Sequence, residues 1–227
     1  MNDSGPRPEG ASVRVKICGL TRAEDARHAE TAGADYVGVV LTPGFGRSVE
    51  PAAAARMLEG VSVDRVAVLV DEPPHRAAEA ARTIGASVLQ LHGGEGRDTV
   101  RALRDAGGWR IWKALRARSV EDVARTVRDL GDLVDGFLVE GWRAGAVGGA
   151  GLRLDADPDE VRRAIPSDRI FVLAGGLIPE TVNAVVARFR PDVVDVSSGV
   201  ERERGVKDPA RVEAFVRAAR NVVPRSM

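Results

Sequence analysis

The chain contains little cysteine, few aromatic residues and no excess of charge of either sign. Its 227 residues include one cysteine, Cys18, which excludes an internal disulfide framework and agrees with a reducing compartment. Lys plus Arg and Asp plus Glu both total 33, so no net charge attracts nucleic acid. No apolar run approaches the roughly 20 residues of a membrane span, and the N-terminus lacks the apolar segment of a signal peptide. We therefore expect a cytoplasmic protein that binds neither nucleic acid nor membrane.

A polar N-terminal stretch precedes a long alternating pattern. Residues 1–12 carry Pro6, Pro8 and several glycines, and we expect a flexible tail there. In residues 13–227, short apolar runs alternate with amphipathic stretches without a long linker, which indicates one α/β domain. The runs are rich in Val, Ile and Leu, as is typical of parallel strands buried on both faces. The expected strands are 13–20, 36–41, 66–70, 88–92, 111–115, 134–140, 170–174 and 193–197.

Eight strand–helix units are the number that closes a (β/α)₈ TIM barrel, a fold of typically about 250 residues. An open doubly wound sheet is the alternative. Its dinucleotide-binding form has a G-x-G-x-x-G turn after the first strand, and Cys18-Gly19-Leu20-Thr21 is not such a turn. The sequence therefore predicts the barrel. Thr21 and Glu24 have capping-box spacing, which predicts that the first helix begins directly after Cys18.

Three chemically active side chains stand at the predicted strand ends, where barrel enzymes carry their active sites. Cys18 ends the first strand, His92 the fourth and Glu140 the sixth. A thiolate on one side of the mouth and a protonated carboxyl on the other suit proton transfer at a sugar carbon. A free cysteine is more often a small buried hydrophobe, and His92 fits a structural hydrogen bond as well as a substrate contact. Lys16 is expected to be structural, one layer deeper, and not to lower the thiol pKa directly.

Glycine and serine turns follow the last two predicted strands. Gly175 and Gly176 follow the seventh, and Ser197, Ser198 and Gly199 follow the eighth. Their backbone N–H groups are unobstructed by bulky side chains, and this is where TIM barrels commonly hold a phosphate. The alternative is that the glycines only make tight turns. No Walker-type motif is present, so we expect the phosphate to belong to a small organic substrate.

A loop arginine, the histidines and a glycine-rich segment complete the candidate features. Arg47 suits a bidentate pair with a substrate carboxylate, or is an ordinary solvated loop arginine. His28, His75 and His92 share no ligand spacing, so the sequence indicates no metal site. Residues 143–153 are interpreted as a lid over the substrate, with a flexible loop as the alternative.

Motifs spread over the whole chain beyond the tail resemble the phosphoribosylanthranilate isomerase family, and they occur in the family's order. The first and the last of these motifs are, together, specific for the family. They are Lys16-Ile17-Cys18-Gly19-Leu20-Thr21, Gln90-Leu91-His92-Gly93, Gly148-Gly149-Ala150-Gly151, Ala174-Gly175-Gly176-Leu177, Asp195-Val196-Ser197-Ser198-Gly199-Val200-Glu201 and Gly205-Val206-Lys207-Asp208.

The resemblance implies a TIM barrel that performs a cofactor-free Amadori rearrangement in tryptophan biosynthesis. The family converts N-(5-phosphoribosyl)anthranilate to the carboxyphenylamino-deoxyribulose phosphate, using a general acid and a cysteine base. Cys18 matches that base, and Arg47 matches the arginine that meets the anthranilate carboxylate. Asp195 matches an aspartate near the substrate, and the turns after strands seven and eight match the phosphate grip. Barrels of this type are monomers or homodimers.

Four departures from the family pattern fall in the half of the site away from the phosphate. The family's Leu-Leu-Asp, whose Asp is the general acid, is here Leu138-Val139-Glu140, and its Ser-Pro-Arg is Phe45-Gly46-Arg47. Its Gly-Gly-Thr-Gly and Phe-Asp-Trp are altered at 148–151 and 154–156. The extra methylene of Glu140 moves its carboxyl by roughly an ångström, which costs up to about a hundredfold in rate. The alternatives are a relative acting on another phosphoribosyl or amino-sugar phosphate adduct, or a non-catalytic barrel that binds a phosphorylated ligand.

Overall fold

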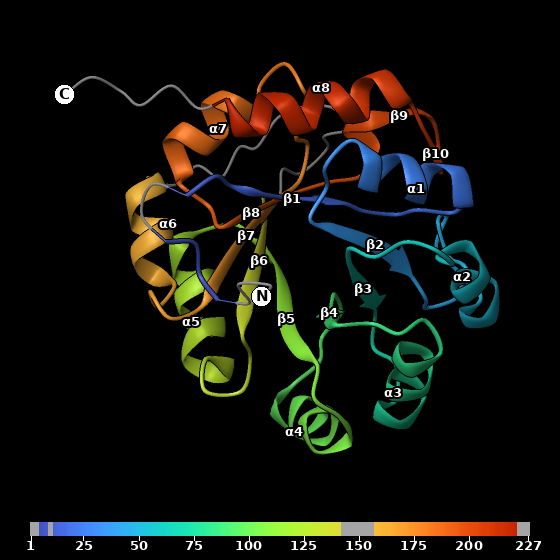
Figure 1. The fold of residues 1–227 in the computed structure, drawn as a ribbon. Coiled ribbons are helices and arrows are strands. Elements are labelled where there is room, and N and C mark those ends of the chain that lie inside the picture. The colour runs from blue at the N-terminus through green and yellow to red at the C-terminus, as the bar shows by residue number, and fades with distance from the viewer. Residues whose placement is uncertain (1–4, 9–10, 142–156, 222–227) are drawn as a thin grey trace.

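The computed structural model describes residues 5–8, 11–141 and 157–221, which form a closed barrel of eight parallel strands inside a ring of helices (Figure 1). Neighbouring strands pair in chain order and β1 also pairs with β8, so the predicted TIM barrel is confirmed. The strands are β1 Arg14–Ile17, β2 Tyr36–Val40, β3 Asp64–Leu69, β4 Val88–Leu91, β5 Arg110–Ala117, β6 Gly136–Gly141, β7 Ile170–Ala174 and β8 Val193–Val196.

Each strand is followed by a helix that covers the outside of the barrel (Figure 1). Between β8 and α8 the chain adds a 3-10 turn, η1 (Ser198–Val200), and a short hairpin of β9 (Glu201–Glu203) and β10 (Val206–Lys207). The helices are α1 Ala23–Thr31, α2 Pro51–Met57, α3 Pro74–Thr83, α4 Arg97–Ala106, α5 Val120–Leu130, α6 Pro158–Ala164, α7 Val182–Phe189 and α8 Pro209–Arg220.

The start of α1 differs from its prediction. Arg22, and not Thr21, is the N-cap residue, and it makes no capping bond with its side chain. The Thr21 hydroxyl instead donates to the carbonyl of Gly205 at 2.6 Å. The predicted capping box is therefore wrong, because the hydroxyl ties the loop after β1 to the β9–β10 hairpin.

Two apolar layers hold the barrel together. The larger layer lies between the strands and the helices, and the smaller one fills the barrel interior. Inside the barrel, the rings of Tyr36 and Trp112 meet edge to face with centroids 5.1 Å apart. Such burial of large aromatic side chains contributes both apolar area and a preferred ring geometry. The barrel interior around these two rings is therefore a packed core.

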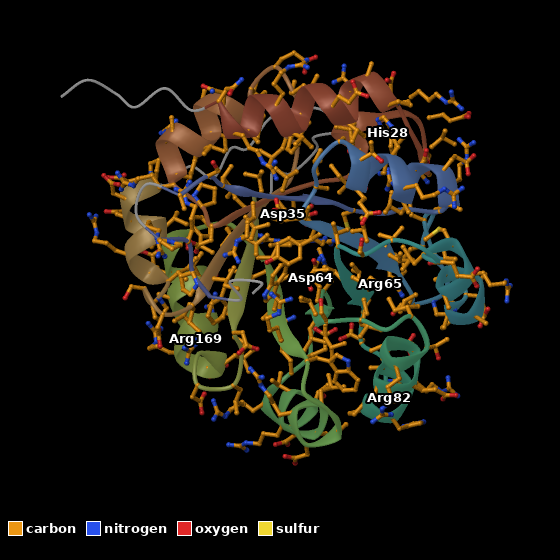
Figure 2. All side chains as sticks on the ribbon, in the orientation of Figure 1. His28, Asp35, Asp64, Arg65, Arg82 and Arg169 are labelled. Atoms are coloured by element: carbon orange, nitrogen blue, oxygen red, sulfur yellow. The ribbon has the colours of Figure 1, made fainter. Side chains whose placement is uncertain are left out.

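Aspartates at the amino ends of the strands fix the pairing of neighbouring strands. Asp35, Asp135 and Asp192 each accept a backbone N–H of the preceding strand at 2.7 Å. The donors are Val15, Ile111 and Phe171 respectively. In Figure 2, Asp35 lies near the centre of the ring of helices, whereas Arg82 lies at its periphery. This end of a TIM barrel serves stability, which places the functional site at the opposite end.

Part of the N-terminal segment lies against the stability end of the barrel. The backbone N–H of Arg7 donates to Asp192 Oδ1 at 2.7 Å, and Arg14 donates to the carbonyl of Gly5 at 2.6 Å. That residues 1–12 form a flexible tail and residues 13–227 a single domain remains a prediction. The segment interpreted as a lid, 143–153, lies outside the described residues. Within the described part of the chain, no helix combines the length and apolar character needed to cross a bilayer.

Candidate active site

A cavity of about 870 Å³ opens at the carboxyl ends of the strands, and its size is that of a typical small-molecule site. Every candidate site residue chosen from the sequence lines it, although the residues come from six different strand ends and loops. The structure thus brings together Cys18, Arg47, His92, Glu140, Gly175, Gly176, Asp195, Ser197, Ser198 and Gly199.

Cys18 stands directly after β1, with its thiol at the floor of the cavity and only 8% of the residue exposed. Its backbone N–H donates to the carbonyl of Val196 at 2.8 Å, which extends the pairing of β1 with β8 by one residue. The next residue, Gly19, has φ +68. A Cβ there would lie 2.6 Å from Arg47 Cδ and 2.7 Å from Ser197 Oγ. Glycine at this position therefore allows both the left-handed backbone conformation and the close approach of these two side chains.

Lys16 lies against Cys18 inside the barrel. The ammonium group is fully buried and pairs with Asp195 at 3.0 Å. It also lies beside the thiol, since the Cys18 Sγ and Lys16 Nζ both approach the same face of Gly38. Burial raises the pKa of the Cys18 thiol, and the positive charge and hydrogen bond of Lys16 oppose that rise.

The expectation for Lys16 is half right. Its polar partner inside the barrel is present as Asp195, but the expectation that Lys16 does not act on the thiol directly is wrong. Side chains two residues apart on one strand face the same way, and here the long lysine stem folds toward the cavity past Gly38. For Lys16 itself, burial alone would lower the pKa, but Asp195 and Cys18 together raise it.

Glu140 lies on β6, and two side-chain nitrogen atoms lie near its Oε2. His92 Nε2 is 3.4 Å from it and Arg116 Nε is 3.5 Å from it. The other ring nitrogen of His92, Nδ1, is 2.9 Å from the Gln90 side-chain amide. The hydrogen bond from His92 lowers the Glu140 pKa, against the opposing effect of burial. The shift favours the ionised form of Glu140 in the absence of substrate, and the assignment of Glu140 as general acid stays a prediction.

Arg47 does not point freely into the cavity. Its Nε and Nη2 donate to the two carboxylate oxygens of Glu201 at 2.7 and 2.6 Å. Lys207 Nζ donates to the same carboxylate at 2.8 Å and to the carbonyl of Ser197 at 3.1 Å. Burial would raise the Glu201 pKa, but the two cations hold it below its ordinary value. The cluster of Arg47, Glu201 and Lys207 therefore carries a net positive charge and fixes the loop after β2 to the loop after β8.

The turns after β7 and β8 form a shallow surface of backbone amides. Gly175 and Gly176 have φ +91 and +65, and the chain after β8 turns through η1. No backbone hydrogen bond of the described turns and loops uses the amides of Gly175, Gly176, Ser198 or Gly199. Amides left free at such a turn attract an anion such as a phosphate.

Gly199 joins these two turns, and its replacement by alanine is expected to weaken phosphate binding. A Cβ at this position would lie 1.8 Å from the backbone carbonyl oxygen of Leu177, so one of the two turns must move. We expect KM for a phosphorylated substrate, and Ki for inorganic phosphate, to rise at least about tenfold. Gly108→Ala is the control, since a Cβ there meets no atom within 4 Å. Equal constants for the two variants would contradict a phosphate site at this junction.

A buried ion pair supports the loop that carries His92. Glu95 Oε2 accepts from Lys113 Nζ at 2.7 Å, and Glu95 also accepts the backbone N–H groups of Asp71 and Gly93. Lys113 donates to the carbonyl of Gly93 as well, at 2.6 Å. Burial would raise the Glu95 pKa, but Lys113 lowers it below the ordinary value. The loop after β4 is therefore held by a satisfied polar network.

Replacing Glu95 with alanine is expected to cost about 3–5 kcal/mol of unfolding free energy, because Lys113 is left buried without its counter-charge. Since the Glu95 pKa is lowered on folding, its contribution is present above the ordinary carboxyl pKa of about 4.3 and is lost as pH falls through the folded value. Urea unfolding at pH 7 and pH 3 measures both effects. Exposed Glu79→Ala is the control, with an expected change within about 0.5 kcal/mol. A loss for Glu95→Ala that is the same at both pH values would contradict the account.

The two other histidines lie away from the cavity. His28 lies on the outer ring, where its Nε2 is 3.1 Å from the carbonyl of Pro209 (Figure 2). His75 is exposed on α3. Among the described residues, no group of three or more His, Cys, Asp or Glu side chains is placed to hold a metal ion.

The sequence did not identify the partners of the chosen residues. Glu201 and Lys207 fall within quoted motifs, but neither was assigned a role. Arg116, after the buried run of β5, is recognisable from the sequence as a residue at a strand end, but its position beside Glu140 was not predicted. Arg204, which lines the cavity, sits in the β9–β10 turn, for which the apolar pattern gives no indication.

The family model for N-(5′-phosphoribosyl)anthranilate (PRA) isomerase matches residues 15–218. The chain belongs to this family. It is similar to the N-(5′-phosphoribosyl)anthranilate isomerases of Chromohalobacter salexigens (40% identity, covering 90% of this chain and 92% of the relative) and Rubrobacter xylanophilus (38% identity, 92% and 100%). The resemblance stated from the motifs is therefore confirmed.

Solved structures of the family share the fold over nearly their whole length. The Thermotoga maritima phosphoribosylanthranilate isomerase superposes with a TM-score of 0.81 at 32% identity, covering 91% of this chain and 98% of that chain. A phosphoribosylanthranilate isomerase in complex with reduced 1-(o-carboxyphenylamino)-1-deoxyribulose 5-phosphate has a TM-score of 0.78 at 32% identity, with coverage of 91% and 98%. A further structure is of monomers generated from the dimeric Thermotoga maritima enzyme (TM-score 0.78, 32% identity, 92% and 99%).

Proposed function

We propose that the chain isomerises N-(5′-phosphoribosyl)anthranilate to 1-(2-carboxyphenylamino)-1-deoxyribulose 5-phosphate, a step of tryptophan biosynthesis, without a cofactor. The observation that carries the proposal is a single cavity, in a member of this family, where a thiol, a carboxyl and free turn amides converge. These are the base, the acid and the phosphate site that such a reaction needs. A cytoplasmic location and a monomeric or homodimeric state belong to the same proposal.

The phosphate and the aromatic carboxylate of the substrate fix its orientation. The amides of the turns after β7 and β8, with Ser197 and Ser198 beside them, receive the phosphate. Arg47 donates with its unused Nη1 to the carboxylate, while Glu201 holds the guanidinium in place through Nε and Nη2. Anchoring both ends places the ribose between Cys18 and Glu140, which is the main rate advantage of a bound geometry.

The chemistry is two proton transfers within one substrate. Glu140, with His92 beside it, donates a proton to the furanose ring oxygen, so the C1′–O bond breaks and an open-chain protonated imine forms, with its positive charge on the nitrogen. The Cys18 thiolate then removes the C2′ proton, and the resulting enol tautomerises to the ketone. The Lys16 ammonium stabilises the thiolate, and Asp195 holds that ammonium in place. No atom is gained or lost, as an isomerisation requires.

Both pKa shifts oppose the protonation states that the reaction uses. Burial raises the pKa of the Cys18 thiol, and the hydrogen bond from His92 lowers that of Glu140, so the shifts favour the proton on sulfur. The reactive form, a thiolate with a protonated Glu140, is reached by moving one proton across the site. An anionic substrate favours this form at Glu140, because added negative charge raises the pKa of a nearby carboxyl.

The proposal is tested by giving the purified protein freshly generated phosphoribosylanthranilate. We expect its fluorescence to be lost faster than in a blank that corrects for spontaneous hydrolysis, and the product to have the mass of the substrate with one ketone. Protein first denatured by heat is the matched control. Loss no faster than the blank, with the native fold shown by circular dichroism, would contradict the proposed substrate.

A further inference from the structure

A second arginine stands at the cavity edge beside Arg47. Arg204 lies in the turn of the β9–β10 hairpin, where Gly205 has φ +82 and allows the tight reversal. Its side chain is exposed and lines the cavity. The hairpin is anchored at both sides, by Thr21 Oγ1 on the Gly205 carbonyl and by the Lys207–Glu201 pair. Arg204 is thus presented to the cavity on a fixed support.

The charge of Arg204 is uncompensated within the described residues, whereas that of Arg47 is paired. Glu201 holds Arg47 through two hydrogen bonds, but no carboxylate of the described chain forms an ion pair with Arg204. A guanidinium group without a counter-ion at the wall of a ligand cavity attracts an anionic ligand group.

Gly46 makes room for this arginine. A Cβ at position 46 would lie 3.0 Å from both Cδ and Nη1 of Arg204, so the guanidinium lies over the bare backbone next to Arg47. The two arginines therefore meet at one edge of the cavity, on the loops after β2 and β8. The phosphate turns, in contrast, follow β7 and β8 and are built from backbone amides.

We propose that Arg204 binds the aromatic carboxylate of the substrate together with Arg47, and so selects substrates whose aryl group carries that charge. The inference rests on the proposed function. Arg47 contributes an orientation fixed by Glu201, and Arg204 contributes a second guanidinium that no carboxylate of the described chain pairs with. Such an ion pair contributes the same binding free energy in the ground state and in the transition state. Its loss therefore raises KM and leaves kcat unchanged.

The test compares Arg204→Gln with Arg202→Gln, an exposed arginine of the same hairpin that does not line the cavity. For phosphoribosylanthranilate we expect Arg204→Gln to raise KM about tenfold with kcat unchanged, and Arg202→Gln to change neither. Calorimetry with reduced 1-(o-carboxyphenylamino)-1-deoxyribulose 5-phosphate should show the same loss of affinity. Ribulose 5-phosphate, which lacks the aryl carboxylate, should bind both variants equally.

Gly46→Ala provides an independent arm, since it displaces the same guanidinium. It should raise KM in the wild-type background and have little further effect in Arg204→Gln. Unchanged KM in Arg204→Gln, with an active wild type, overturns the inference and leaves the proposed function standing. Weaker binding of ribulose 5-phosphate by Arg204→Gln assigns the arginine to the phosphate and also overturns it. Failure of the wild type to turn over phosphoribosylanthranilate or bind the reduced analogue overturns both proposals.

Discussion

Replacing Cys18 with alanine is expected to lower kcat for phosphoribosylanthranilate by about 10²–10⁴-fold, the contribution of one positioned general base. In the proposed mechanism the Cys18 thiolate accepts the proton from C2′. Among the described residues that line the cavity, the other titratable side chain against the Lys16 ammonium is Asp195, which is already paired with it. Steady-state kinetics with freshly generated substrate measures the loss.

The fold and the binding site are expected to survive this change. Cys18 is a small side chain, so its removal leaves a cavity costing on the order of 1 kcal/mol, and the turns proposed to bind the phosphate follow other strands, β7 and β8. Binding of the reduced product analogue, measured by calorimetry, should stay within a few-fold of wild type. Cys18→Ser keeps the volume but supplies a hydroxyl, a far weaker acid than a thiol, and should also be nearly inactive. A kcat for either variant close to wild type would exclude the thiol as the base.

Replacing Glu140 with glutamine is expected to lower kcat/KM by about 10²–10⁴-fold, because an amide of the same shape has no carboxyl proton to donate. His92 and Arg116 lie within 3.5 Å of the carboxylate and bias it toward ionisation. The proton therefore has to be placed on Glu140 in each cycle. The pH dependence of kcat/KM reports this arrangement.

Between the pKa of Glu140 and the pKa of the Cys18 thiol, each rise of one pH unit increases the thiolate fraction tenfold and decreases the protonated Glu140 fraction tenfold. The two changes cancel, so we expect kcat/KM to be flat between about pH 5 and 8. Below the Glu140 pKa it falls. Arg116→Gln removes a charge that lowers that pKa, so the acidic limb should move to higher pH and the plateau should rise. The shift is expected to be less than about one unit because Arg116 is largely exposed. Arg128→Gln on α5 is the matched control, and a limb that moves equally in both variants would argue against Glu140 as the titrating acid.

The apolar pattern was sufficient for the barrel and for the position of the site. Short Val-rich runs such as β2 and β8 are typical of strands buried on both faces of a parallel sheet, and eight strand–helix units in series are the number of a closed barrel. Once the barrel is predicted, residues at strand ends such as Cys18 and Glu140 must share one mouth. Their joint presence on one cavity follows from topology and not from any contact that the sequence encodes locally.

The pairings within the site could not be predicted in this way. Arg47 and Glu201 are 154 residues apart, and a free loop arginine and one held by a carboxylate have the same local sequence. The thiol environment depends on how the Lys16 stem passes Gly38, which is a matter of packing and not of strand periodicity. The protonation state of Glu140 likewise depends on the distances to His92 and Arg116. These pairings and distances join residues from different strands and loops, so they follow only from the three-dimensional structure.

The central claim is that Cys18 and Glu140 together isomerise phosphoribosylanthranilate although the family's general acid is one methylene shorter. The most direct test measures kcat/KM for this substrate in the wild type and in Glu140→Asp, side by side. We predict turnover by the wild type, with Glu140→Asp no more active, since the shorter side chain draws the carboxyl away from His92 and Arg116, and a displacement of roughly an ångström costs up to about a hundredfold. An inactive wild type that gains activity on Glu140→Asp would contradict the account.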